Sequence, residues 1–232
     1  MSVAERPWRA LVVSLAALVA VFVLFEFTGA DLAVQDRLFD FATGKWRVDA
    51  KDSLGRALFY NGPKYLIIAA AVALLVLAVA PGRWRERIRV DRCGLVVALL
   101  TLASVPVLAG QGKATTNVFC PYENRRYGGD VAYIKVLERF PDDDRPARKG
   151  RGFPAGHSSG GFALIGLLWL RRGRAWRAGV IALALIVGWW MGGYQMLKGA
   201  HYLSHTVVTM VFALCMALAW RCVLPGRVAG VR

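Results

Sequence analysis

Only three of the 232 residues are histidine and only four are cysteine, so both residue types are scarce. Acidic residues are scarce as well, because 15 Asp and Glu stand against 30 Lys and Arg, which gives a formal net charge of +15. Carboxylates are nearly absent from the long apolar runs, where Glu26 is the main exception, and this argues against an ion or proton pathway across a membrane. No polar stretch is long enough for a sizeable soluble domain, so residues 1–232 are predicted to form a single unit.

The cysteines give no disulfide framework. Cys120 is expected on one side of a membrane, whereas the other three are expected in or near the opposite halves of helices, at Cys93, Cys215 and Cys222. Partners on opposite sides of a bilayer cannot reach the short Cα–Cα distance that a disulfide requires. A stabilising set of disulfides is therefore excluded.

Long apolar runs dominate the chain, since 56% of the residues are hydrophobic and the mean hydropathy is +0.43. A membrane-spanning helix needs about 20 apolar residues, and only helices and closed barrels satisfy backbone hydrogen bonds in lipid. We therefore predict an all-α bundle of six transmembrane helices, at about 10–30, 63–81, 93–111, 157–170, 178–197 and 202–221. The fourth run is short and is expected to extend into Arg171–Arg174. The first could instead be a cleaved signal peptide.

Arginine clusters indicate the orientation of this bundle. Short basic segments at 83–92 and 171–177 predict a cytoplasmic face with both termini on that side. The cluster from Arg83 to Arg92 is predicted to contact anionic lipid headgroups, and this placement of the charge argues against nucleic acid as a partner. The sequence thus predicts a multi-pass membrane protein, and the compact frame together with the family resemblance given below implies a bacterial inner membrane.

Two longer segments, about 31–62 and 112–156, are expected on the opposite, periplasmic face. The first is mixed and charged, with Trp46 and Tyr60 as expected interfacial anchors, and can form a short amphipathic helix on the membrane. The second is long and polar, and loops of that length are usually functional or mobile.

All three histidines are predicted to converge at this periplasmic face. The third span ends near Lys113 and the fourth begins at His157. The fifth span returns to the same face at Lys198, and the sixth leaves it at His201 and His205. Counting the spans therefore brings residues that are far apart in sequence to one membrane level.

The backbone and the lysines of this region suit a phosphate group. The helix that begins near Ser158 offers free N–H groups and the positive end of its dipole, and Gly156 allows close approach of the backbone. Lys113 and Lys198 can neutralise phosphoryl oxygens. We therefore predict a phosphate-binding site between these residues.

The histidines suit the chemistry of phosphoryl transfer. Histidine exchanges protons near neutral pH and can attack phosphorus. His157 is therefore predicted to protonate a leaving oxygen, and His201 to act as the nucleophile. His205 follows His201 by one helical turn, where it can orient or polarise the ring.

Three segments resemble the signatures of the type-2 phosphatidic acid phosphatase superfamily, which includes membrane lipid phosphatases and vanadium haloperoxidases. The spacing of its K-x6-R-P signature is matched by Lys113–Pro121, that of P-S-G-H by Pro154–His157, and that of S-R-x5-H-x3-D by Tyr194–His205. The resemblance covers about 63–221 and is to the membrane lipid phosphatase branch.

The resemblance implies an activity and roles for several residues. His201 would form a phosphohistidine, His157 would be the general acid, and Lys113 with backbone amides would hold the phosphate. The implied enzyme is a hydrolase that requires neither a metal nor a cofactor. Its implied substrates are lipid phosphate monoesters or pyrophosphates, such as undecaprenyl pyrophosphate, phosphatidic acid, phosphatidylglycerol phosphate or lipid A phosphate.

Two arginines and one aspartate of the signatures are replaced, by Cys120, Gln195 and His205. Arg125 and Arg126 follow Cys120 closely and are predicted to fold back as substitutes, and Lys198 lies near the helix face of Gln195. A neutral His205 can accept a hydrogen bond from the nucleophile but adds no negative charge beside an imidazolium. The sequence therefore predicts a divergent active enzyme or one shaped for an unusual substrate.

Other interpretations of the same residues stay open. The enzyme could transfer the phosphoryl group to another lipid, or the bundle could bind lipid headgroups without catalysis. His201 and His205 also have the spacing of a metal-ligand pair, with a third ligand from His157, Cys120 or an outer acid. The acidic run Asp142–Asp144 is predicted to be a solvated loop rather than a cation site.

Overall fold

A computed structural model describes residues 7–224, most of which are helical. Its α-helices are α1 (Pro7–Phe27), α2 (Ala30–Gln35), α3 (Ser53–Arg56), α4 (Gly62–Val79), α5 (Gly82–Arg87), α6 (Arg92–Thr115), α7 (Gly156–Ala163), α8 (Arg174–Leu197) and α9 (Leu203–Val223). Its other elements are strands β1 (Phe39–Asp40) and β2 (Lys45–Trp46), the π-helix η1 (Ala57–Asn61), and the 3-10 helices η2 (Pro121–Glu123), η3 (Arg125–Tyr127), η4 (Asp142–Asp144) and η5 (Leu164–Trp169). The strands pair as one short antiparallel hairpin, so the fold is helical apart from this addition.

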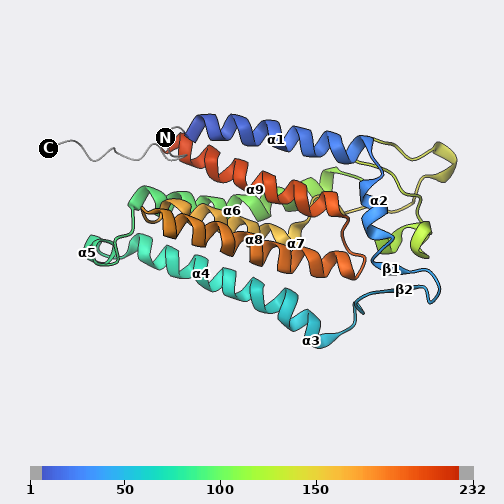
Figure 1. Cartoon of the computed structure of the whole chain (residues 1–232), viewed down its shortest axis with the longest axis horizontal. Helices are drawn as coiled ribbons and strands as arrows, with labels where there is room; N and C mark the ends of the chain where they lie inside the picture. Colours follow the sequence, from blue (N-terminus) through green and yellow to red (C-terminus); the bar gives the residue numbers. More distant parts are fainter. Residues whose placement is uncertain (1–6, 225–232) are drawn as a thin grey trace.

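The long helices lie side by side in a bundle (Figure 1). Five helical stretches are long and apolar enough to cross a membrane, namely α1, α3–α4, α6, α8 and α9, which indicates a membrane protein. The start of α1, the end of α9 and α5 lie together at one end of the bundle, here called the α5 end. The β1–β2 hairpin and α2 lie at the other end, here called the hairpin end.

The fourth predicted span is a shorter, mixed helix that runs through α7 and η5. A rise of 1.5 Å per α-helical residue and 2.0 Å per 3-10 residue gives it a length of roughly 24 Å, against about 30 Å for a hydrocarbon core. The expected extension into Arg171–Arg174 is wrong. The chain turns at Gly173, whose φ of 119° favours glycine, and α8 begins at the next residue.

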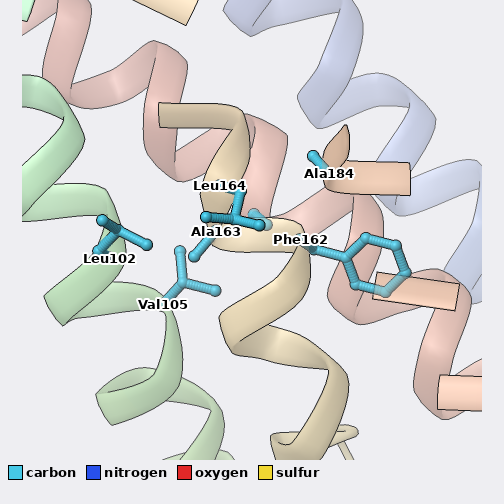
Figure 2. Close-up of a cluster of buried hydrophobic side chains, with 7 residues drawn as sticks. Leu102, Val105, Phe162, Ala163, Leu164 and Ala184 are labelled. Atoms are coloured by element: carbon cyan, nitrogen blue, oxygen red, sulfur yellow. The ribbon is translucent and has the colours of Figure 1, made fainter. Parts of the chain in front are cut away.

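This short helical segment forms the centre of the bundle, where it packs against α6, α8 and α9. A Cβ added to Gly161 would lie 2.7 Å from the Gly188 Cα, so α7 and α8 approach as closely as their backbones allow. The core cluster around this crossing contains Leu102, Val105, Phe162, Ala163, Leu164, Ala184 and Ala213 (Figure 2). Tight packing therefore fixes the level of the α7 N-terminus within the bundle.

The first outer segment is not a single amphipathic helix. It contains α2 and the hairpin, and the second spanning helix already begins at Ser53 rather than at the predicted Pro63. Asp52 caps this helix, because its carboxylate accepts hydrogen bonds from the N–H groups of Leu54 at 3.1 Å and Gly55 at 3.0 Å. Pro63 has no N–H to donate, and the wider π-helical turn η1 before it accommodates the missing bond.

Aromatic packing joins this segment to the rest of the hairpin end. Trp46, predicted to be an interfacial anchor, instead packs against Phe39 and Tyr127, with ring centroids 4.8 and 5.1 Å away. A Cβ added to Gly199, whose φ is 73°, would lie 2.3 Å from the Trp46 ring. The link between α8 and α9 is thus held against the hairpin. All four cysteines are free, as the absence of a disulfide framework predicts.

Candidate active site

The three histidines lie close together at the hairpin end. His157 is in the first turn of α7, His201 is in the link between α8 and α9, and His205 is in the first turn of α9. His157 Nδ1 is 3.4 Å from His201 Nε2, and His201 Nδ1 is 3.3 Å from His205 Nδ1. The structure therefore brings together the three side chains predicted to carry the chemistry.

The contact between His201 and His205 determines which nitrogen of His201 can react. The two Nδ1 atoms face each other, so a hydrogen bond between them requires one to carry the proton and the other to accept it. When His201 donates this proton, its lone pair is on Nε2, the atom that faces His157. In this tautomer, one of the two that the Nδ1–Nδ1 contact allows, Nε2 has the free lone pair and the hydrogen bond to His205 holds the ring in place.

Burial keeps His201 neutral. Its side chain is 1% exposed. Burial lowers the pKa of His201 well below its usual value, and the positive charge of Lys113 acts in the same direction, as do His205 and His157. The backbone of Gly152 opposes this shift only in part, and no carboxylate is among the groups that act on the ring. The neutral imidazole, which is the nucleophilic form, therefore predominates at neutral pH.

The N-terminus of α7 has free N–H groups beside these rings. Its N-cap residue, Ala155, makes no side-chain cap, and the Ala155 N–H donates to the His205 carbonyl at 3.2 Å. The hydroxyls of Ser158 and Ser159 donate to the carbonyls of Ala155 and Gly156, at 3.4 and 2.6 Å. The N–H groups from Gly156 onward are thus available to an anion at the positive end of the helix dipole.

Lys113 lies over the start of α7. It belongs to the last turn of α6, and a Cβ added to Gly156 would be 3.0 Å from its Cε atom and 3.7 Å from its Nζ atom. Any residue larger than glycine at position 156 would therefore require the Lys113 side chain to shift. The charge of Lys113 acts on both His157 and His201, so an anion at the α7 N-terminus would meet this ammonium group.

Lys198 approaches the same site from the end of α8. Its Nζ atom is 5.0 Å from the ring centroid of Tyr194, which is a cation–π contact. Partial burial lowers the pKa of Lys198, and the nearby positive charge of Arg56 lowers it further. The charge of Lys198 also acts on His157, so this lysine contributes to the electrostatic environment of that ring.

Three residues of the second span lie close to α7 and His157, although the sequence analysis did not place them there. The rings of Tyr60 and His157 have centroids 4.8 Å apart, and a Cβ added to Gly160 would be 3.5 Å from Ile67. Lys64 lies between Tyr60 and Ile67 on the same helix face, and its charge acts on His157. The spacing of these three residues was a usable signal. The sequence analysis missed this spacing because the predicted span began at Pro63, which separates Tyr60 from Lys64 and Ile67.

Arg125 and Arg126, predicted to substitute for the missing arginine, have other partners. Arg125 forms an ion pair with Asp144. Arg126 binds Asp36 through two hydrogen bonds, from Nε at 2.7 Å and from Nη2 at 2.8 Å. No described contact brings either guanidinium to the histidines. Binding a phosphate there would require these ion pairs to open, because the outer segments supply their own carboxylates.

The residues that replace the two signature arginines are neutral. Burial raises the pKa of the Cys120 thiol to about 12, with a further contribution from Glu123. Gln195 is 1% exposed, and neither atom of its amide has a hydrogen-bond partner among the described residues. Neither position can supply the charge of a guanidinium, so the cations that act on His157 and His201 among the described residues are Lys64, Lys113 and Lys198.

A carboxylate from α2 fixes the start of α9. Asp31 Oδ1 accepts a hydrogen bond from the Ser204 N–H at 2.7 Å. Burial raises the pKa of Asp31 to about 6, although its hydrogen bonds to Ser204 oppose the shift. Ser204 lies between His201 and His205 in sequence, so this contact helps to position both rings. No local pattern predicts a contact between residues so far apart in the chain.

The alternative interpretations find less support in the geometry. Among residues 7–224, no third His, Cys, Asp or Glu completes a set of metal ligands. In the acidic run, Asp142 and Asp144 form ion pairs with Arg145 and Arg125. This run is therefore an exposed turn tied to its neighbours, as predicted for a solvated loop.

Comparison with known proteins supplies one further observation. The model of the PAP2 superfamily matches residues 93–228, which is more than half of the chain. The matched range contains Lys113 and all three histidines. No curated protein and no solved structure matches the chain.

Proposed function

This chain belongs to the PAP2 superfamily, and on that premise we propose that it is an integral membrane phosphatase that hydrolyses a phosphate monoester or pyrophosphate of a lipid. Membership of the superfamily by itself suggests phosphatase activity. The observation that carries the proposal is the line of His157, His201 and His205 at the uncapped N-terminus of α7, with Lys113 beside it.

The first step transfers the phosphoryl group to His201. Its Nε2 lone pair attacks phosphorus, and the bond between phosphorus and the leaving oxygen breaks. Without substrate, His157 Nδ1 is 3.4 Å from that Nε2. With the phosphate anion bound, His157 is the imidazolium, moves aside and donates its extra proton to the leaving oxygen, which leaves it a neutral imidazole. His205 keeps the hydrogen bond to Nδ1 of His201 while this ring becomes positively charged. The product is a phosphohistidine and the released lipid alcohol or lipid phosphate.

The second step releases phosphate. Water attacks the phosphohistidine, and His157, now without its proton, accepts one from this water. The bond between phosphorus and Nε2 breaks, and His201 returns to the neutral form that its burial favours. The histidines therefore finish the cycle as they began it.

Lysines and backbone N–H groups provide the charge that stabilises the transition state. The amides at the start of α7 and the ammonium group of Lys113 would contact the phosphoryl oxygens directly. Lys198 and Lys64 lie near His157 and would meet the leaving group or a second phosphate. This set of lysines takes the part that the missing guanidiniums have in the signatures.

We place the protein in a bacterial inner membrane with six spans. Five are the long helices, and the sixth is the shorter α7–η5 segment that these helices surround. The basic α5 end would lie in the cytoplasm with both termini, where the cluster from Arg83 to Arg92 would contact anionic headgroups. The histidines would then lie at the periplasmic face, and a lipid of the outer leaflet would enter headgroup first. Candidate substrates are undecaprenyl pyrophosphate, phosphatidic acid, phosphatidylglycerol phosphate and lipid A phosphate.

The test is phosphate release from this panel of lipids by the purified full-length protein. Wild type should turn over at least one lipid, and His201→Ala of the same monodispersity and helix content should show no turnover. EDTA should leave the rate unchanged, whereas inhibition that added metal reverses would favour a metal site at His201 and His205. Radiolabelled substrate should leave acid-labile phosphate on wild type and none on the variant.

A phosphotransferase is the second candidate, because the phosphohistidine that forms in the first step can be attacked by a lipid hydroxyl instead of water. Added lipid alcohols would then increase the release of the first product. Absence of both turnover and labelled intermediate in folded wild type would overturn the catalytic proposal and favour a headgroup-binding protein.

A further inference from the structure

A second cavity lies far from the histidines, in the half of the bundle toward the α5 end. It is a groove of about 860 Å³ between the first halves of α1 and α8, and its floor is formed by η5 and the second half of α9. Phe162 and Ala184, which belong to the core cluster drawn in Figure 2, also line this groove. The groove exists because α1 packs mainly on α9, which leaves α1 and α8 apart.

The body of this groove is apolar. Val13 on α1, Ile181 on α8 and Leu214 on α9 line it, and Val13 and Ile181 are exposed. Some exposed apolar surface is expected wherever helices face lipid. A groove of this depth differs from a flat lipid-facing surface because it can enclose one acyl chain on three sides.

Two arginines give the groove a charged rim. Arg9 is in the first turn of α1 and Arg177 is in the first turn of α8, and both line the same groove. Neither forms an ion pair with any of residues 7–224. Both lie at the end of the bundle where the start of α1 and α5 are found (Figure 1), which is where a lipid headgroup would be.

We propose that this groove is a binding site for one anionic phospholipid, with its phosphate between Arg9 and Arg177 and an acyl chain along the groove toward Phe162. The positive rim and the apolar body match the two parts of such a lipid. The site rests on the membrane placement given above but not on catalysis, and its ligand is a resident lipid rather than a substrate.

A second copy of the chain is a poorer occupant. Another copy would bring its own basic α5 end, with Arg83, Arg85 and Arg87, against the two rim arginines. Like charges at such an interface oppose association. An anionic lipid instead neutralises the rim and fills the space between α1 and α8, so it should also stabilise the contact of α1 with the bundle.

Native mass spectrometry of the detergent-purified full-length protein tests this site. The probe is a phosphatidylglycerol, compared with a phosphatidylcholine that carries the same acyl chains. Wild type should retain one phosphatidylglycerol in preference to phosphatidylcholine. Arg9→Gln/Arg177→Gln should weaken this retention on the order of tenfold or more, because two basic contacts are lost. The matched control, Arg172→Gln/Arg174→Gln, removes two exposed arginines at the same end that do not line the groove, and it should change retention little.

A second pair of variants tests the apolar body. Ala17 lines the groove and the exposed neighbouring Ala16 does not, so Ala17→Trp should block retention whereas Ala16→Trp should preserve it. Equal binding of both lipids, or unchanged retention in the rim variant or in Ala17→Trp, would overturn the proposal. So would a dimer that excludes the lipid. His201→Ala should bind phosphatidylglycerol as wild type does, which separates this result from the outcome for catalysis.

Discussion

Two sets of basic side chains at the hairpin end differ in whether they form ion pairs. In the outer loop, each of three arginines is paired with a carboxylate, as Arg125–Asp144, Arg126–Asp36 and Arg148–Asp130. Around the histidines, three lysines have no ion pair with any of residues 7–224, namely Lys64, Lys113 and Lys198. The same end of the molecule thus pairs these three arginines with acids and leaves the three lysines around the histidines without an acidic partner among the described residues.

The difference has a functional meaning. Paired charges fix the loop, and their effect on pKa is clear: Arg148 lowers the pKa of Asp130 to about 2. Lys198, which is unpaired and partly buried, instead carries a desolvation cost that lowers its pKa. That cost is offset only when an anion arrives. We therefore expect a negatively charged ligand to bind where cations cluster without acidic partners.

The largest expected effect comes from removing the central unpaired cation. Lys113→Gln should reduce kcat/KM by roughly 100- to 1,000-fold, the usual effect of losing one group that stabilises transition-state charge. Arg126→Gln, which removes a paired cation at the same end, should change kcat/KM little. Phosphate release by both folded variants tests the contrast. Similar losses in the two variants would show that pairing does not separate structural cations from functional ones.

A carboxylate placed among the unpaired charges should change the pH profile. His201 must be neutral to attack, so activity requires a pH above its pKa, and its lowered pKa should carry the acid limb of kcat/KM below the usual histidine value of 6.5. His205→Asp adds a negative charge that stabilises the imidazolium and raises this pKa, so the acid limb should move toward neutral pH.

The rate of His205→Asp at neutral pH should be preserved or raised. Rates measured from acid to neutral pH give the acid limb of kcat/KM for wild type and for His205→Asp. Complete loss of activity in folded His205→Asp would refute the role given to His205, and an unmoved limb would show that another group controls it.

Lys64 and Lys198 should have smaller effects, since their charges act on His157, whereas the charge of Lys113 acts on both His157 and His201. Lys64→Gln and Lys198→Gln should each lower kcat/KM by about tenfold, chiefly through KM. Lys45→Gln on the exposed hairpin is the matched control and should have wild-type kinetics. A wild-type KM for Lys64→Gln would remove the second span from the substrate site.

The smallest expected effect is on stability. Asp36→Asn breaks the pair with Arg126 and weakens the hydrogen bond from Tyr127, so thermal stability should fall slightly while kcat stays unchanged. The pKa of Asp36 is lowered in the folded protein, mainly by Arg126. Its contribution is therefore present above its unfolded-state pKa and is lost as pH falls through the folded one.

Thermal midpoints of Asp36→Asn and wild type should accordingly differ at neutral pH and low salt, and converge in acid. A difference that persists in acid would assign the stabilisation to packing rather than to charge.

The span count was enough to predict the convergence of the histidines. Apolar run length and the positions of His157 and His201 relative to the run ends depend on local composition, which a sequence displays directly. The length of the fourth helix was harder to predict from the sequence. Its 3-10 half and the turn at Gly173 depend on tight packing against α6 and α8. Packing of that kind leaves only scattered glycines as its signal.

The sequence could not reveal which cations lack acids. Arg126 was a reasonable phosphate ligand until Asp36, from the first outer segment, proved to be its partner. Lys64 was overlooked because Pro63 looked like the start of a helix, whereas the π-helical turn η1 lets the helix continue through it. Both errors concern contacts between segments, which periodicity along one segment does not encode.

The bond from Asp31 to Ser204 has a consequence for how this molecule could be re-engineered. The family match begins at residue 93, yet three residues that precede it act on the histidine region: Asp31 holds the start of α9, the Tyr60 ring lies against His157, and the charge of Lys64 acts on His157. If the proposed function holds, a chimaera that exchanges residues 1–92 while keeping an acid at position 31 should retain the histidine chemistry and change which substrate is preferred.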